Sequence, residues 1–173
     1  MKLLQVCLLG SCALLTTTTF AEKHTLSLGY AQTDVQDVMD LDGVSLQYRY
    51  ENESPLGFVS TLSYQTGEEN WEDFDYSEKL EAKHFTLLAG PAYRVNNFIS
   101  AYAVAGLAHT KIENSYVDYD YSESTELTET NFAYGAGVII NPTEQLAINI
   151  GYEGTKVDSV KLDGFNISAG YRF

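Results

Sequence analysis

The residues whose types and spacing come nearest to a chemical site lie between Asp118 and Glu129. Asp118, Asp120, Ser122 and Glu129 occupy positions 1, 3, 5 and 12 of a helix–loop–helix calcium loop. That loop needs a glycine at position 6 for its sharp turn, but the residue there is Glu123, and no helical pattern flanks the segment. The sequence therefore predicts no defined metal site, and weak screening of these acids by divalent cations is the alternative.

The histidines form no recognisable ligand set. His24, His84 and His109 lie far apart in the chain, without the short spacings at which zinc ligands recur. We expect them to be solvated or to face the inside of a folded sheet. The sequence accordingly predicts no metal and no cofactor, so any function must depend on how the folded chain presents its surface.

The elements that would position these residues are strands. In the last twelve residues, alternate positions are apolar and end in aromatics, while the positions between them are small or polar, which is the period of a β-strand. The apolar set here is Phe165, Ile167, Ala169, Tyr171 and Phe173. Similar alternation predicts seven more strands, over His24–Thr33, Gly43–Glu51, Phe58–Gln65, Ala82–Val95, Phe98–Lys111, Asn131–Ile140 and Gln145–Thr155. No helical segment remains to cover the apolar faces, so they are expected to face lipid around a closed sheet.

The connections between these strands alternate between short and long. Tight turns are expected at residues 53–57, 96–97 and 141–144, and longer connections at 34–42, 67–80, 112–130 and 157–161. This alternation predicts an all-β, eight-stranded antiparallel up-and-down transmembrane β-barrel with four extracellular loops and both chain ends in the periplasm. Side chains fill a barrel of this size, so no open pore is expected. Both faces of Phe98–Lys111 are rich in alanine, and our assignment places Tyr102 and Val104 outside.

Residues 1–21 have the three parts of a secretory signal peptide: basic Lys2, the apolar run from Leu3 to Leu15, and small residues before Glu22. The alternative is a lipoprotein signal in which Cys12 is lipidated. We expect residues 22–173 to be the mature barrel. Cys7 and Cys12 both lie within the signal, so the mature chain is expected to have no disulfide.

Charge excludes one class of partner and suggests an internal network. The formal net charge of −14 becomes −15 once Lys2 leaves with the signal, which argues against binding nucleic acid. Five charged residues fall on inward positions of the predicted strands, namely Arg49, Glu51, Arg94, Glu153 and Arg172. Charges inside a narrow barrel must be paired, so we expect them to form a structural network. A proton or ion path is the alternative.

Several motifs together resemble the Ail/OmpX/Lom family of small outer-membrane β-barrel proteins. They are the runs at 87–94 (LLAGPAYR), 132–138 (FAYGAGV), 141–142 (NP), 150–153 (IGYE) and 169–173 (AGYRF). The resemblance implies an eight-stranded barrel whose strands continue outside the membrane as a sheet. It also implies insertion by the barrel-assembly machinery, which reads a terminal aromatic strand such as the one ending at Phe173. Members with assigned roles act in host attachment, in serum (complement) resistance, or as stress-linked envelope proteins.

The two longest connections depart from the adhesive members that the chain resembles. Those members tend to have basic loop patches suited to polyanions, whereas residues 67–80 contain six acids against Lys79, and residues 112–130 contain six acids and no basic residue. Such loops would repel heparan chains or lipopolysaccharide phosphates. Aromatic residues are interleaved with the acids, at Trp71, Phe74, Tyr76, Tyr116, Tyr119 and Tyr121. They could anchor a protein partner or pack the hairpins together, and both interpretations stay open.

The sequence therefore predicts a non-enzymatic surface protein of a Gram-negative outer membrane, acting in host attachment or complement resistance through its extracellular loops. The expected partners are membrane lipids and lipopolysaccharide, the barrel-assembly machinery, and a host-surface or complement-regulatory protein, with the chain itself a monomer. A structural or stress-response barrel without a dedicated ligand is the first alternative. A lipid A-modifying enzyme is the second, and it is disfavoured because neither His84 nor His109 is followed by a serine two residues on.

Overall fold

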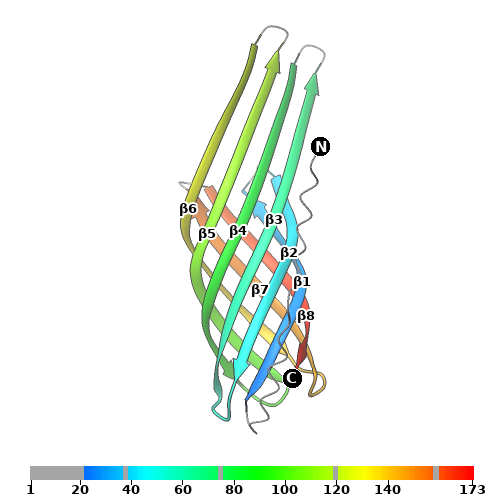
Figure 1. The fold of residues 1–173 in the computed structure, drawn as a ribbon, viewed down its shortest axis with the longest axis vertical. Coiled ribbons are helices and arrows are strands. Elements are labelled where there is room, and N and C mark those ends of the chain that lie inside the picture. The colour runs from blue at the N-terminus through cyan, green and yellow to red at the C-terminus, as the bar shows by residue number, and fades with distance from the viewer. Residues whose placement is uncertain (1–21, 37–38, 74–75, 119–120, 158–159) are drawn as a thin grey trace, which may run out of the picture.

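The computed structural model describes residues 22–36, 39–73, 76–118, 121–157 and 160–173, so the predicted signal peptide lies outside the described residues. Eight strands pair antiparallel in chain order, and the last pairs with the first to close a barrel (Figure 1). The described residues contain no helix long and apolar enough to cross a membrane. The strands are β1 (Lys23–Val35), β2 (Met39–Glu51), β3 (Leu56–Asp73), β4 (Tyr76–Arg94), β5 (Ile99–Asp118), β6 (Tyr121–Ile140), β7 (Leu146–Val157) and β8 (Val160–Arg172). The predicted eight-stranded barrel is confirmed.

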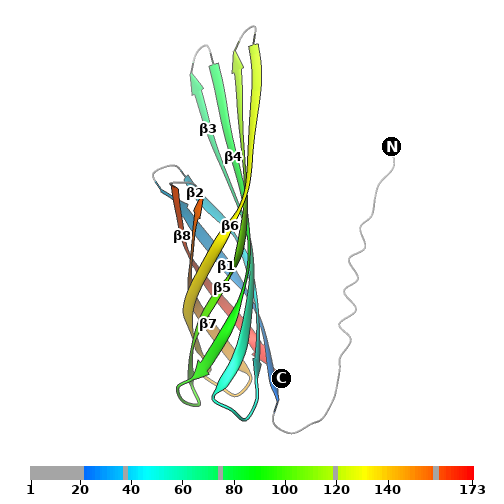
Figure 2. The same cartoon turned by 90° about the vertical axis from the view of Figure 1, so that its left-hand side faces the viewer.

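The strands fall into two length classes. β1, β2, β7 and β8 have 12–13 residues, while β3 to β6 have 18–20. The four longer strands continue past the barrel rim as one sheet, at the end opposite the C-terminus (Figures 1 and 2). The prediction of long loops at 67–80 and 112–130 is therefore wrong, because Gly67 pairs with Ala82 and Ile112 with Leu127. A sheet solvated on both faces needs no apolar alternation, which is why the pattern did not reveal these strand extensions.

The outer surface of the barrel carries an apolar band between two aromatic belts. The belt near the tight turns includes Tyr48, Phe58, Tyr93, Phe98, Tyr171 and Phe173, and the belt near the projecting sheet includes Tyr30, Tyr64, Phe85, Tyr134, Tyr152 and Phe165, all exposed. Between the belts the exposed residues are aliphatic, and Leu28 is 65% exposed. Aromatic belts flanking an aliphatic band are the surface of a barrel that spans a lipid bilayer.

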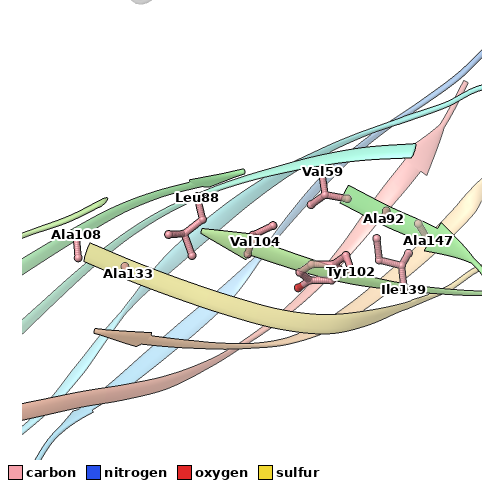
Figure 3. Packing of buried hydrophobic residues seen from close by; sticks show 9 residues of the cluster. All are labelled: Val59, Leu88, Ala92, Tyr102, Val104, Ala108, Ala133, Ile139 and Ala147. Carbon is pink, nitrogen blue, oxygen red and sulfur yellow. The ribbon is translucent and has the colours of Figure 1, made fainter. Parts of the chain in front are cut away.

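The barrel interior is packed with side chains. One buried apolar cluster, shown in Figure 3, includes Val59, Leu88, Tyr102 and Ile139. A second, around Leu41 and containing Val35, Met39, Ala82, Val157 and Leu162, lies where the barrel meets the projecting sheet. These clusters and buried polar side chains such as Glu153 and Asn166 together fill the interior, as expected for eight strands.

The outward assignment of Tyr102 and Val104 is wrong. Tyr102 is 6% exposed and Val104 is 5% exposed, and both point into the barrel (Figure 3). Room for the phenol comes from two glycines, because a Cβ at Gly137 or Gly151 would lie 2.5 or 2.3 Å from the Tyr102 hydroxyl. The alternation within β5 could not reveal this, since the space is provided by β6 and β7.

Filling this space should destabilise the barrel. A Gly151→Ala methyl would meet the Tyr102 hydroxyl and the side-chain amide of Asn166, and we expect a loss of about 1–3 kcal/mol in unfolding free energy, the usual cost of overpacking. Urea unfolding in vesicles would measure it. Adding Tyr102→Phe removes the hydroxyl and should recover part of the loss. A double variant that is no more stable than Gly151→Ala alone would contradict this account.

Candidate functional site

The sheet that projects from the barrel has two free edges. β2 pairs with β3 only as far as Thr66, so in the described part of the chain Gly67–Asp73 has a neighbouring strand only on the β4 side. β7 pairs with β6 only from Ala133 onward, and Thr155 of β7 donates its hydroxyl to the Phe132 carbonyl at 2.8 Å, so among the described residues 121–131 have a neighbouring strand only on the β5 side. We call residues 67–73, 76–82, 112–118 and 121–132 the extracellular sheet. At residues 69–73 and 121–131 the backbone has no second neighbouring strand in the described part of the chain, and such edges can pair with another strand.

The extracellular sheet is tied to the barrel at its base. Leu80 and Ile112 are partly buried and pack against the apolar cluster around Leu41. Lys111 bridges β5 and β6 at this level, since its ammonium contacts Glu113 and lies 3.2 Å from the carboxylate of Glu126. These contacts continue the barrel's packing into the base of the sheet.

The extracellular sheet is rich in acidic residues, and the nearest cations whose side chains are described, Lys83 and Lys111, already contact carboxylates. Lys111 contacts two carboxylates, and the Lys83 ammonium lies 3.8 Å from Glu81. The hydrogen bond from Lys111 lowers the pKa of the Glu113 carboxyl. The carboxylates of Glu113 and Glu126 in turn raise the pKa of Lys111. These cations therefore offer little free positive charge to an anionic partner.

The pairing of Lys111 with Glu113 makes the stability of the folded chain depend on pH, and the direction of each pKa shift gives the sign. The pKa of Glu113 is lowered from 4.5, so its contribution to stability is present above pH 4.5 and is lost as the pH falls through its folded value. The pKa of Lys111 is raised from 10.5, so its contribution is present below pH 10.5 and is lost as the pH rises through its folded value. An NMR titration of the Glu113 carboxyl should give a midpoint below 4.5 that returns to the ordinary range in Lys111→Gln. In Lys156→Gln, outside this bridge, the midpoint should not move, and an unmoved midpoint in Lys111→Gln would contradict the assignment.

Four of the six candidate aromatics, Trp71, Tyr76, Tyr116 and Tyr121, lie in the outer parts of the strands of the extracellular sheet. The backbones of Tyr76 and Tyr121 pair with the same residue, Asp118, and those of Trp71 and Tyr116 both pair with Glu78. This register brings four of the candidate positions together in the sheet. Phe74 and Tyr119 lie outside the described residues, and the side chains of the other four lie outside the described part as well. A binding role for the six therefore stays a prediction.

Three of the five predicted lumen charges meet at the periplasmic end of the barrel. The buried Glu51 carboxylate accepts at one oxygen, Oε2, from Nη2 of Arg49 at 2.5 Å and from Nη2 of Arg172 at 3.0 Å. Arg49 Nη2 also donates to Oδ1 of Asn141 at 3.0 Å. Asn141 was not among the predicted members, and the Asn-Pro pair after β6 signalled only a turn.

The other two predicted lumen charges lie elsewhere. Glu153 is buried and accepts from Thr86 Oγ1 and Asn166 Nδ2, each at 2.9 Å, with Ser63 Oγ at 3.3 Å. Arg94 is only partly buried, and its Nη2 donates to the carbonyls of Asn52, Glu53 and Ser54 in the β2–β3 turn, at 3.2, 3.2 and 2.9 Å. The structure thus places the five charges at three separate positions, because hydroxyls and amides satisfy Glu153 and backbone carbonyls hold Arg94.

Phe173 lies at the seam where β8 meets β1. Its N–H donates to the carbonyl of His24 at 2.8 Å, and its carbonyl accepts from the His24 N–H at 2.9 Å. Its ring is 65% exposed and stacks on His24 and Tyr171, with centroids 5.9 and 6.4 Å apart. The terminal aromatic thus belongs to the periplasmic belt.

The residues tested for metal or catalytic chemistry are engaged in other contacts. A ring nitrogen of each histidine is hydrogen-bonded to a hydroxyl at 2.8–2.9 Å, His24 to Tyr48, His84 to Thr110 and His109 to Thr130. Asp118 and Ser122 belong to the paired strands β5 and β6. Among the described residues, no group of three or more His, Cys, Asp or Glu side chains lies close enough to hold a metal ion.

Known proteins match nearly the whole chain. Residues 2–173 match the family described as Enterobacterial Ail/Lom protein. The chain is 39% identical over 163 residues to the virulence membrane protein PagC of Salmonella typhimurium, with 88% of each chain covered. It is 34% identical over 158 residues to outer membrane protein X of Escherichia coli, with 90% of this chain and 89% of that one covered. The crystal structure of Ail, the attachment invasion locus protein of Yersinia pestis, in complex with the heparin analogue sucrose octasulfate has a TM-score of 0.78 at 29% identity, covering 88% of this chain and 99% of that one.

These matches agree with the barrel, its apolar band and its projecting sheet, and they place the protein in the outer membrane. The names of the relatives are those of membrane, virulence and attachment proteins rather than of enzymes. The chain belongs to the Ail/OmpX/Lom family of small outer-membrane β-barrel proteins.

Proposed function

We propose that this protein acts at the cell surface in host attachment or complement resistance, by binding a protein partner on its extracellular sheet. The observation that supports the proposal is the sheet itself, which extends β3 to β6 beyond the apolar band and leaves residues 69–73 and 121–131 without a second neighbouring strand among the described residues. Free strand edges recruit an extended segment of a partner through main-chain hydrogen bonds, and flanking side chains then provide selectivity. The virulence and attachment names of the relatives support the same role.

The chemistry of the partner follows from charge. Ail of Yersinia pestis was solved in complex with a sulfated heparin analogue. Here the sheet carries many acids, and Lys83 and Lys111 already contact carboxylates, so a polyanion would be repelled. We therefore propose a neutral or basic protein, either a host-surface protein or a complement regulator, and not a heparan chain.

The remaining roles that we propose concern assembly and the membrane. The exposed Phe173 ring at the β1–β8 seam is accessible to the barrel-assembly machinery. The aliphatic band would contact lipids, and the belt near the sheet would meet lipopolysaccharide. We propose a monomer without enzymatic activity, since the barrel closes on itself and the described histidines are bonded to hydroxyls.

The experiment removes the extracellular sheet and keeps the barrel. One variant would replace 69–80 and 113–126 each by Asn-Gly, joining Glu68 to Glu81 and Ile112 to Leu127, residues that already pair across each hairpin. A serum-sensitive laboratory strain expressing either form would be scored for serum survival and adherence to cultured cells, after heat-shifted gel mobility confirms folding. We expect protection or adherence with the intact protein only.

A second variant tests the negative charge of the extracellular sheet while keeping the sheet itself. It would keep both hairpins and replace the acids of residues 68–81 and 113–129 by Asn or Gln. If a neutral or basic protein binds the sheet, heparin binding should stay absent in the native protein and the neutralised form should change partner affinity. If neither the intact nor the shortened protein differs from empty host cells, the adhesion and resistance role is excluded, and a structural envelope barrel becomes the better assignment.

A further inference from the structure

All three arginines of this acidic chain lie at the periplasmic end of the barrel. Arg49 and Arg172 meet over Glu51, and Arg94 lies beside the β2–β3 turn, although β2, β4 and β8 carry them from far apart in the sequence. Lys23, at the start of β1, lies at the same end. The guanidinium group presents a planar fork of donors that matches carboxylate and phosphate oxygens, so this is an unusual concentration of oxyanion-binding groups.

The buried part of this cluster is short of negative charge. Two guanidiniums, Arg49 at 1% and Arg172 at 8% exposure, share a single oxygen of one carboxylate, Glu51. Nε and Nη1 of Arg49 and Nε of Arg172 have no hydrogen-bond acceptor among the described protein atoms. Buried charges and donors are costly unless they are paired, so the cluster has both the charge and the donors to accept an anion.

A cavity borders this cluster at Arg172. It measures about 380 Å³, lies at the periplasmic mouth, and is lined by Arg172 together with Lys23, Arg94, Asn97, Asn141 and Glu144. Three of these lining residues are cations and one is an acid. Arg172 thus belongs both to the cavity wall and to the buried cluster, with one of its donors unpaired.

The geometry points to an oxyanion-binding site in the periplasmic mouth, with Arg172, Lys23 and Arg94 as its cationic groups. The ligand is a carboxylate or phosphate group, either as a free ion or at the end of a short peptide entering from the periplasm. Arg172 donates through its buried guanidinium, while Lys23 and Arg94 provide charge at the rim. The site lies at the opposite end of the barrel from the extracellular sheet and is independent of binding there.

The test titrates the folded mature chain in nanodiscs with inorganic phosphate and with acetyl-alanyl-alanine, at constant ionic strength set by chloride. The C-terminal amide of the same dipeptide is the matched uncharged ligand. Backbone amide signals of residues 23, 94, 97 and 141, together with the Nε–H signals of Arg94 and Arg172, would report binding. We expect saturable shifts with phosphate or with the free carboxylate but not with the amide, and the arm that responds distinguishes a free ion from a peptide terminus.

Three variants locate the site. Arg172→Gln should weaken binding by roughly tenfold or more, as loss of a charge-assisted hydrogen bond does, and exposed Lys23→Gln by about threefold. Lys161→Gln, an exposed charge removal at the extracellular end, should leave the affinity unchanged. If Arg172→Gln does not insert, judged by heat-shifted gel mobility, Lys23→Gln still tests the site. Shifts no greater than chloride produces, or equal responses in Lys23→Gln and Lys161→Gln, would overturn the proposal.

Discussion

Replacing Glu51 by Gln should lower the unfolding free energy by about 3–5 kcal/mol, the cost of removing one partner from a buried ion pair. The carboxylate accepts from both Arg49 and Arg172, so its loss leaves two guanidiniums without a negative charge in the barrel interior. Gln has nearly the same volume, so the change tests charge rather than packing. Urea unfolding of the protein in vesicles, in a buffer without phosphate, would measure the effect.

Glu53→Gln is the matched control for this prediction. Glu53 is exposed in the turn two residues later, and only its backbone carbonyl is used, by Arg94. The same removal of one acid should therefore change stability by no more than about 0.5 kcal/mol. Equal effects of the two substitutions would show that Glu51 is not held as a buried counter-ion.

Placing arginine on the lipid face should be nearly as costly. Leu28 is 65% exposed, and its neighbours on the same face, Leu46 and Ala169, lie within the aliphatic band. We expect Leu28→Arg to lose about 2–4 kcal/mol, the range for a charged side chain near the middle of the bilayer on a barrel's lipid face. Urea unfolding in vesicles of uniform lipid composition would measure it.

Leu127→Arg makes the same substitution at a different depth. Leu127 is also an exposed leucine, at 45%. It lies on β6 in the extracellular sheet, beyond the aromatic belt near that sheet. Its replacement should change stability by less than about 0.5 kcal/mol, as ordinary surface substitutions do. A large loss at both positions, or at neither, would mean that the membrane boundary lies elsewhere.

Much of the fold could be predicted from local alternation. A barrel strand in lipid must place apolar side chains outward at every second residue, and β6 and β8 do so clearly, with Tyr134, Val138, Phe165 and Ile167 all exposed. β5 was misassigned because alanines occupy both of its faces. Its register depends on Gly137 and Gly151 of other strands, which make room for Tyr102.

The candidate site was predicted only in part. The acidic character of residues 67–80 and 112–130 is a property of composition and could be read directly. Only the family resemblance implied that these segments form a paired sheet, which the structure confirms, because backbone hydrogen bonds hold β3 to β6 together and place no demand on side-chain alternation. The two free edges follow from the different lengths of neighbouring strands.

By itself, the sequence determined the barrel, its outward face, its tight turns and the negative charge of its outer end, because each of these is set by residues close together in the chain. Only the tertiary structure decided which interior groups meet. Arg49 and Asn141 are 92 residues apart, and Ser63 and Glu153 are 90 residues apart. Such pairs depend on how the eight strands are staggered around the barrel, and that stagger divided the expected charge network and brought Arg49 and Arg172 to the same carboxylate, Glu51.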